Sequence, residues 1–257
     1  MISALEPTRA IAWKDLDASA LSPEARKIVG ESWRERAKQE HLAVGAFSMI
    51  GQELAALGCD PIVLALVTKA SWDEVRHAEV CRKMAVAMLG ENEVPTHWRG
   101  VPKIPAHEGA SDEARVLLHV AEMCCLSETM TGVYFTEMLA RATNPIARTA
   151  IASLLEDELD HGKVGWAYLG ARKRDGTLEG LAEALPELLD RTVVRALVPR
   201  PDAKDDSAME AFGYLGNNAS CEMILRAAFE VILPGFEAVA IDTSAARAHL
   251  NDRRTRA

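Results

Sequence analysis

Four long stretches of this sequence have no proline after their first two positions, and each is bounded by residues that start or stop helices. The first begins at Ser22-Pro23-Glu24, where Ser caps the helix, Pro suits its first position and Glu favours the positive end of the helix dipole. Gly58 is a typical residue at which such a helix ends. By the same signals, the other three stretches cover residues 60–90, 111–143 and 144–172. The sequence therefore predicts four helices of roughly 28 to 36 residues.

The connections between these helices limit how they can pack. The first and third connections are short, so each flanking pair of helices is expected to be antiparallel. The middle connection, residues 91–110, contains three prolines and cannot form a long helix. About 20 extended residues reach at most ~70 Å, which exceeds the ~45 Å length of a 30-residue helix. The second and third helices can therefore run parallel, giving two antiparallel hairpins joined by one long crossover.

Residues 173–257 exceed a bare four-helix bundle and also have helical character. A helix is expected over about 177–197, and Pro186 is expected to kink or split it. A break over 199–206 separates it from two or three helical segments over 207–250, which Pro234-Gly235 interrupts.

Composition supports an all-α fold, since only 5% of residues are aromatic and no run of β-branched residues occurs. No domain boundary is evident. We predict a single all-α domain over 1–257, with a four-helix bundle at 22–172 and a helical extension at 173–257.

One short motif occurs twice, in the second and the fourth predicted helix. Each copy has the form Asp-Glu-x-x-His, at residues 73–77 and 157–161, within a stripe of apolar residues. Glu and His three positions apart lie on one helix face and can bind the same ion. Buried charges are costly unless they are paired or bound to metal, so four such groups in core positions call for a cation. The alternative is that both copies lie on solvated, salt-bridged faces, as charge runs commonly do.

Two half-sites of this kind need one more Glu from each of the other two helices. Glu128 is the only Glu of the third helix within its apolar stripe, and Glu40 shares a face of the first helix with Trp33 and Phe47. Both lie near the middle of their helices, as do the glutamates of the two motifs, so all four can share one layer of the bundle. The predicted metal ligands are Glu40, Glu74, His77, Glu128, Glu158 and His161.

The type of ligand indicates the metal. Carboxylates and imidazoles with open coordination positions suit iron or manganese, whereas zinc prefers fewer ligands in a tetrahedral arrangement. Four carboxylates neutralise two divalent ions. We therefore predict two iron ions, with an Fe/Mn or a manganese pair as alternatives.

On these six ligands the chain resembles the ferritin-like di-iron carboxylate proteins, over about residues 30–170. Asp73-Glu74-Val75-Arg76-His77 is also similar to the D-E-x-R-H element of bacterial multicomponent monooxygenases. The second copy of the motif departs from that element, because Asp160 stands where Arg would be expected.

The resemblance also implies how residues around the ligands are arranged. In the family, the Asp before each Glu bonds the metal-bound His of the opposite half. Here Asp73 would orient His161 and Asp157 would orient His77, with Arg76 pairing with both aspartates. Such partners fix the second nitrogen of a ligating imidazole.

The resemblance implies an O₂-activating oxygenase or oxidase that acts on a small organic substrate. It would take electrons from a separate reductase, since the chain has no flavin, nicotinamide or iron–sulfur signature. Hydroxylation, N-oxygenation and desaturation are all compatible with the motif. A ferroxidase or iron store, and a bundle whose metal site is purely structural, are the alternatives. The length of the chain beyond Arg172 favours the first interpretation over storage, because surplus helices can cover a site or build a substrate pocket.

Charge and cysteine usage bound the remaining properties. A net charge of −9 argues against a nucleic-acid partner, which would require a basic face. No uncharged apolar stretch approaches the ~18 residues that cross a membrane. The N-terminus does not resemble a signal peptide, and the five cysteines lack disulfide or zinc spacing, so a cytoplasmic location is expected. A homodimer is compatible with the sequence. One further position, Gly132, lies one turn after Glu128 and indicates either a cavity beside the metals or a close helix contact.

Overall fold

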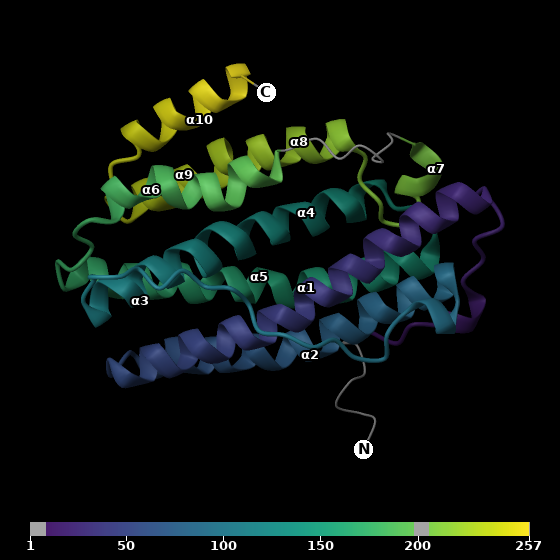
Figure 1. The fold of residues 1–257 in the computed structure, drawn as a ribbon, viewed down its shortest axis with the longest axis horizontal. Coiled ribbons are helices and arrows are strands. Elements are labelled where there is room, and N and C mark those ends of the chain that lie inside the picture. The colour runs from purple at the N-terminus through teal and green to yellow at the C-terminus, as the bar shows by residue number, and fades with distance from the viewer. Residues whose placement is uncertain (1–8, 198–205, 257) are drawn as a thin grey trace.

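The computed structural model describes residues 9–197 and 206–256, and these form helices joined by turns and loops, with no strand among them. The all-α prediction is confirmed. Residues 9–21 are irregular apart from a 3₁₀ turn, η2 (Trp13–Asp15). The four predicted long helices form the body of the molecule (Figure 1).

The first hairpin consists of α1 (Pro23–Ala56) and α2 (Pro61–Leu89), which pack along their whole length. Both begin as the capping residues predict. The Ser22 side chain accepts a hydrogen bond from the backbone N–H of Ala25 at 3.1 Å, and the Asp60 side chain accepts one from Ile62 at 2.8 Å. In each helix proline occupies the first position, where its missing N–H costs nothing.

The second hairpin is formed by the third and fourth predicted helices. The third comprises α3 (Asp112–Val120), a π-helical segment η4 (Ala121–Ser127) and α4 (Glu128–Arg141) in one continuous rod. The fourth is α5 (Pro145–Arg174), capped by the side chain of Asn144. The π-helical segment was not expected from the sequence; it is a rare local widening of a helix that is frequent at functional sites.

The middle connection returns along the length of the bundle, as its reach allows (Figure 1). It contains one 3₁₀ turn, η3 (Glu91–Glu93), and is otherwise extended or irregular. As a result α2 and the α3–α4 rod point in the same direction, and each is antiparallel to its hairpin partner. This is the predicted arrangement of two hairpins and one crossover.

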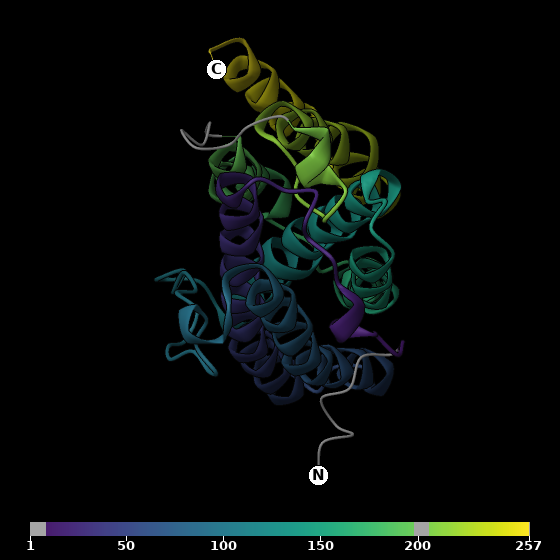
Figure 2. The same ribbon diagram turned by 90° about the vertical axis from the view of Figure 1, so that its right-hand side faces the viewer.

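The C-terminal extension packs on the side of the bundle opposite α2 (Figure 2). Its elements are α6 (Leu181–Leu189), η5 (Asp190–Val194), α7 (Ser207–Glu210), α8 (Asn217–Arg226), η6 (Ala227–Ile232), α9 (Leu233–Ala238) and α10 (Ser244–Arg256). Two details of the prediction differ from the structure. The helix begins only at Leu181, and Pro186 lies inside it without splitting it, because its missing N–H removes a single hydrogen bond while the helical path continues into η5. The helical path also continues through Pro234-Gly235, because Pro234 follows a π-helical segment, and the chain turns at 239–243 instead. The predicted break over 199–206 lies almost entirely outside the described residues.

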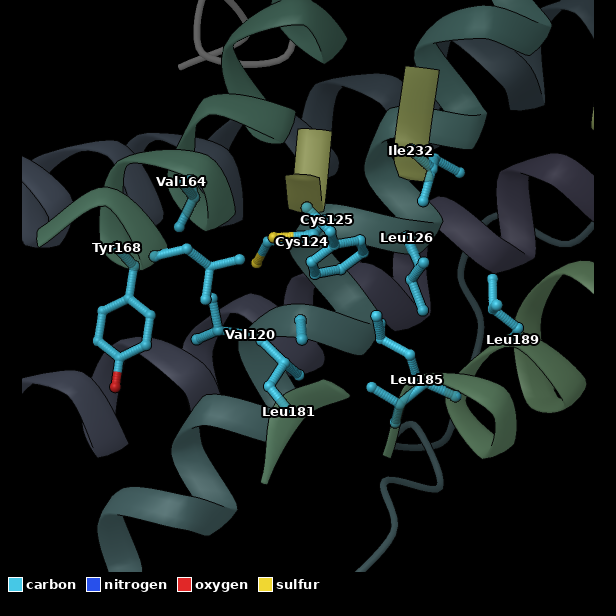
Figure 3. Close-up of a cluster of buried hydrophobic side chains, with 14 of the residues drawn as sticks. Val120, Cys124, Cys125, Leu126, Val164, Tyr168, Leu181, Leu185, Leu189 and Ile232 are labelled. Atoms are coloured by element: carbon cyan, nitrogen blue, oxygen red, sulfur yellow. The ribbon is translucent and has the colours of Figure 1, made fainter. Parts of the chain in front are cut away.

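The extension and the bundle share a hydrophobic core. Leu181, Leu185 and Ile232 from the extension pack against Val120 and Cys125 of the π-containing rod (Figure 3). A second hydrophobic cluster lies toward the other end of the bundle and includes Trp33, Phe135 and Leu154. The two clusters are separated along the helices, and the gap between them contains the predicted ligands.

One helical rod, Asp112–Arg141, is long and apolar enough to cross a membrane by length and composition alone. The central helix of a globular protein meets the same criterion, and 56% of the relevant window is buried inside this fold. The window also includes Glu128, which points into the polar layer described next. We therefore interpret this rod as a core helix.

Candidate metal centre

A layer of charged side chains interrupts the hydrophobic core near the middle of the bundle. Each of the four long helices contributes to it: one residue from α1, two from α2, one from α4 and two from α5. All six predicted ligands are buried, with relative exposures of 5% for Glu40, 1% for Glu74, 2% for His77, 5% for Glu128, 1% for Glu158 and 1% for His161. The alternative of solvated, salt-bridged faces is therefore wrong for these residues.

The two copies of the Asp-Glu-x-x-His motif meet across the contact between α2 and α5. Ligand atoms of Glu74, His77, Glu158 and His161 all lie within 4.8 Å of one another. The closest approaches cross between the copies, with 3.1 Å from His77 Nδ1 to Glu158 Oε1 and 3.0 Å from His161 Nδ1 to Glu74 Oε1. Such a buried group of two carboxylates and two imidazoles can hold a metal ion.

The other two predicted ligands flank this group without belonging to it as closely. Glu128 Oε2 lies 3.6 Å from His161 Nδ1. Glu40 Oε1 lies 3.7 Å from a guanidinium nitrogen of Arg36, and its charge interacts with those of Glu74 and Glu158. The structure thus brings four of the six residues together and places Glu128 and Glu40 at the edge of the cluster.

The hydrogen bonding of the cluster tests whether a cation fits. Buried polar atoms in proteins are almost always paired. Here Glu74 Oε2, both carboxylate oxygens of Glu158, and the Nδ1 atoms of His77 and His161 have no hydrogen-bond partner. Each of these atoms can donate an electron pair to iron or manganese as a metal ligand. The unpaired atoms and the type of ligand therefore both fit a bound metal.

The outer nitrogen of each imidazole is paired, in the crossed manner that the resemblance implies. His77 Nε2 lies 3.3 Å from Asp157 Oδ2, and His161 Nε2 lies 3.4 Å from Asp73 Oδ2. An N–H at Nε2 that donates to a carboxylate leaves the lone pair at Nδ1, which faces the centre of the cluster. The aspartates thereby hold each ring with Nδ1 directed toward the other side chains of the cluster.

Two cations join the aspartates to each other. Arg76 donates a hydrogen bond to Asp73 and another, of 2.9 Å, to Asp157 Oδ2. Lys69 donates to Asp73 Oδ2 at 2.6 Å and to Asp157 Oδ1 at 3.3 Å. Lys69 was not among the residues predicted from the sequence, although its position four residues before Asp73 on one helix is the spacing of a favourable ion pair. Lys69 also lies 3.7 Å from Asp160, the residue that replaces the expected Arg in the second copy.

The pKa directions show a surplus of negative charge in the layer. Burial raises the pKa of Glu128 to about 8, with repulsion from Glu158 and Glu74 acting in the same direction. Burial and the same two carboxylates raise the pKa of Glu40 well above its ordinary value. Burial opposes ionisation of Glu158 too, but the nearby imidazoles of His161 and His77, at 3.4 and 3.1 Å from its oxygens, hold its pKa below the ordinary range. A divalent cation would replace the protons that Glu128 and Glu40 otherwise retain.

Open space adjoins the cluster on the side of Glu40 and Glu128. A cavity of about 350 Å³ is lined by both carboxylates, together with residues of α1, the crossover and the η4–α4 rod. Gly132 is buried, yet a Cβ added there would meet no atom of another element within 4 Å. Of the two explanations for this glycine, the close helix contact is excluded.

No protein-family model, curated protein or solved structure matches this chain. The assignment of the site therefore depends on the geometry above and on the residues that form it.

Proposed function

We propose that the protein is an O₂-dependent oxidoreductase, a di-iron oxygenase or oxidase that oxidises a small organic substrate. The observation that carries this proposal is the set of buried, unpaired donor atoms contributed by the two Asp-Glu-x-x-His motifs. Such atoms are costly to bury without a partner, and redox-active iron has the matching ligand preference.

The six predicted ligands would hold the metal in two groups. Glu74, His77, Glu158 and His161 would bind through the atoms that face one another, while Glu40 and Glu128 would complete the site from its edge. Four carboxylates balance the charge of two divalent ions. Iron bound there would supply the one-electron and O₂ chemistry, and the chain would set its geometry and access. Fe/Mn and manganese pairs use the same ligands and remain alternatives.

Asp73 and Asp157 keep both imidazoles in the orientation that directs Nδ1 inward. Arg76 and Lys69 balance the charge of these aspartates without entering the cluster. The hydrophobic clusters on either side exclude bulk water from the layer. Substrate would approach from the cavity beside Glu40 and Glu128, whose volume falls in the range of small-molecule sites. That cavity favours an enzyme over an iron store. Electrons would come from a separate reductase.

The test is to load the protein with Fe(II) without oxygen, then expose it to O₂ while following absorbance and iron content. About two irons per chain, a transient absorbance change and no further uptake are expected. The His161→Ala variant should lose the iron, whereas His249→Ala should retain it because His249 is paired with Asp190 near the surface. Uptake of many irons per chain would support storage instead, and an unreactive metal would indicate a structural site.

A further inference from the structure

The cavity beside the cluster is one part of a longer cleft that follows α1. A second cavity of about 150 Å³ shares five lining residues with the first, which are Ala46, Pro102, Lys103, Met123 and Ser127. The cleft therefore extends along α1 from Arg36 past Glu40 to Ile50, a rise of roughly 21 Å. The crossover lies over it, and Gly45 permits this approach, since an added Cβ would lie only 2.9 Å from Pro102 Cδ.

The two ends of this cleft differ in chemistry. Near Glu40 it is lined by Arg36, and Lys103 of the crossover lines the part that the two cavities share. The far end is lined by apolar side chains, including Ile50, Ile104 and Met123. Apart from the shared Lys103, the charged or titratable groups at that end already have partners, because Glu122 is paired with Arg191 at 2.8 Å and His119 with Glu53 at 2.8 Å.

The Arg36 side chain is held in place by two aromatic rings and has no carboxylate at hydrogen-bonding distance among the described residues. Its guanidinium carbon lies 4.3 Å from the ring centroid of Tyr134 and 4.9 Å from that of Phe135. Within the described residues Glu40 is the one carboxylate within 4 Å, at 3.7 Å, which is beyond a good hydrogen bond. If Glu40 neutralises a metal, Arg36 leaves a positive charge at this end of the cleft, and Lys103 adds a second one where the two cavities meet.

We infer that the cleft binds an amphipathic carboxylic acid, with its carboxylate at Arg36 and its apolar part directed past Lys103 toward Ile50 and Ile104. This inference rests on the proposed function and gives its substrate class. The ligand would pass beside Glu40 and Glu128, which puts a carbon of its chain next to the metal layer. A planar guanidinium fixed by aromatic stacking is well suited to a carboxylate.

The binding test uses protein loaded anaerobically with Mn(II), and two probes of equal length, octanoate and neutral octanamide, measured by calorimetry. Octanoate is expected to bind about tenfold tighter or more, because hydrogen bonds to a charged partner are the strong ones. Arg36→Met should remove most of that preference without changing the octanamide affinity, and Arg36→Lys should restore part of it. Lys38→Met is the matched control, since Lys38 is an exposed cation on α1 that does not line the cleft.

Three results would overturn the inference. Equal affinity for the two probes would show that the cleft does not distinguish a carboxylate from a neutral amide. A preference for octanoate that persists in Arg36→Met would show that another cation, the metal or Lys103, holds the acid instead of Arg36. Unchanged binding of both probes in Ala46→Leu, which narrows both parts of the cleft, would place the ligand elsewhere. Circular dichroism and thermal melting of each variant identify any loss of folding. If Arg36→Met does not fold, the binding of the two probes to Arg36→Lys and Ala46→Leu tests the inference instead.

The manganese content of the same samples separates this inference from the proposed function. Protein that binds no metal, yet prefers octanoate in an Arg36-dependent manner, would support the cleft assignment and refute the metal function. Protein that binds two ions and shows no preference would refute the cleft assignment alone.

Discussion

Replacing Glu128 with glutamine is expected to stabilise the metal-free protein and to weaken its binding of metal. Glu128 is 5% exposed, and burial raises its pKa to about 8 from an ordinary value of 4.5. At pH 7 the unfolded chain therefore has an ionised Glu128, whereas the folded, metal-free chain has a protonated one. Each pH unit between 4.5 and 7 adds about 1.4 kcal/mol to this penalty.

The sign follows from the direction of the shift. Stability linked to Glu128 is fully present below pH 4.5 and is lost as the pH rises from 4.5 to about 8. The loss amounts to about 3 kcal/mol at pH 7 and to less than about 1 kcal/mol at pH 5. Glutamine has the same shape and does not titrate. Glu128→Gln should therefore raise the melting temperature of the chelated protein by roughly 6–12 °C at pH 7, at 2–4 °C per kcal/mol, and by much less at pH 5.

Bound metal should make the wild type more stable than Glu128→Gln. An ion at a hundredfold excess over its dissociation constant stabilises the wild type by about 2.7 kcal/mol, and the variant should gain far less of this. The assay is thermal unfolding at pH 5 and pH 7, with chelator and with anaerobic Mn(II). Glu122→Gln is the control, because Glu122 lies on the same rod but pairs with Arg191 outside the layer. The reasoning is refuted if the chelated Glu128→Gln protein is less stable than wild type at pH 7, or if its advantage is the same at pH 5.

Three further predictions concern the surroundings of the site and the packing of the bundle. Asp157→Asn should weaken Mn(II) affinity about 10- to 100-fold in calorimetry, while Asp160→Asn changes it little; equal effects would contradict the orienting role. Gly165→Ala should destabilise the protein by about 1–3 kcal/mol in urea unfolding, since the added Cβ would lie 2.5 Å from the sulfur of Cys125. Gly132→Ala meets open space and should leave the stability unchanged or raise it. A Gly132→Ala protein that is less stable than Gly165→Ala would contradict the packing. Burial opposes ionisation of Glu137, but hydrogen bonds from Arg226 and Arg141 lower its pKa. The stability that Glu137 contributes is therefore present above pH 4.5 and is lost as the pH falls. Glu137→Gln should reduce this loss of stability in acid by at most about 1 kcal/mol, and an unchanged melting curve in acid would contradict the prediction.

The ends of the long helices could be predicted because local chemistry determines them. Ser22, Asp60 and Asn144 each place a side-chain acceptor over the free N–H groups of a helix, and proline follows each of them. The path of residues 91–110 also followed from simple reach. These features depend on a few neighbouring residues, so tertiary packing has little scope to override them.

The π-helical segments and the path of the extension depend instead on packing. Nothing in Ala121–Ser127 distinguishes it locally from an ordinary helix, and its widening accompanies the close approach of Gly165 to Cys124 and Cys125. Pro234 is another case, since a preceding π-helical segment lets the helical path continue where proline normally ends it. Sequence patterns do not encode such adjustments.

The meeting of the two Asp-Glu-x-x-His motifs could be predicted because each motif fixes two side chains on one helix face. The burial and convergence of Glu74, His77, Glu158 and His161 follow from that spacing and from the apolar stripes. Glu40 and Glu128 lie at the edge of the cluster, and their carboxylates would have to shift by about an ångström or more to complete the metal coordination. Helical spacing does not determine such side-chain shifts.

Anomalous diffraction from crystals of the iron-loaded protein is the most direct test that this cluster holds a pair of metal ions. We expect two iron peaks about 3.5–4 Å apart, between α2 and α5, in contact with Glu74, His77, Glu158 and His161. Iron peaks only at the surface of the protein, or none at all between these helices, would contradict the account.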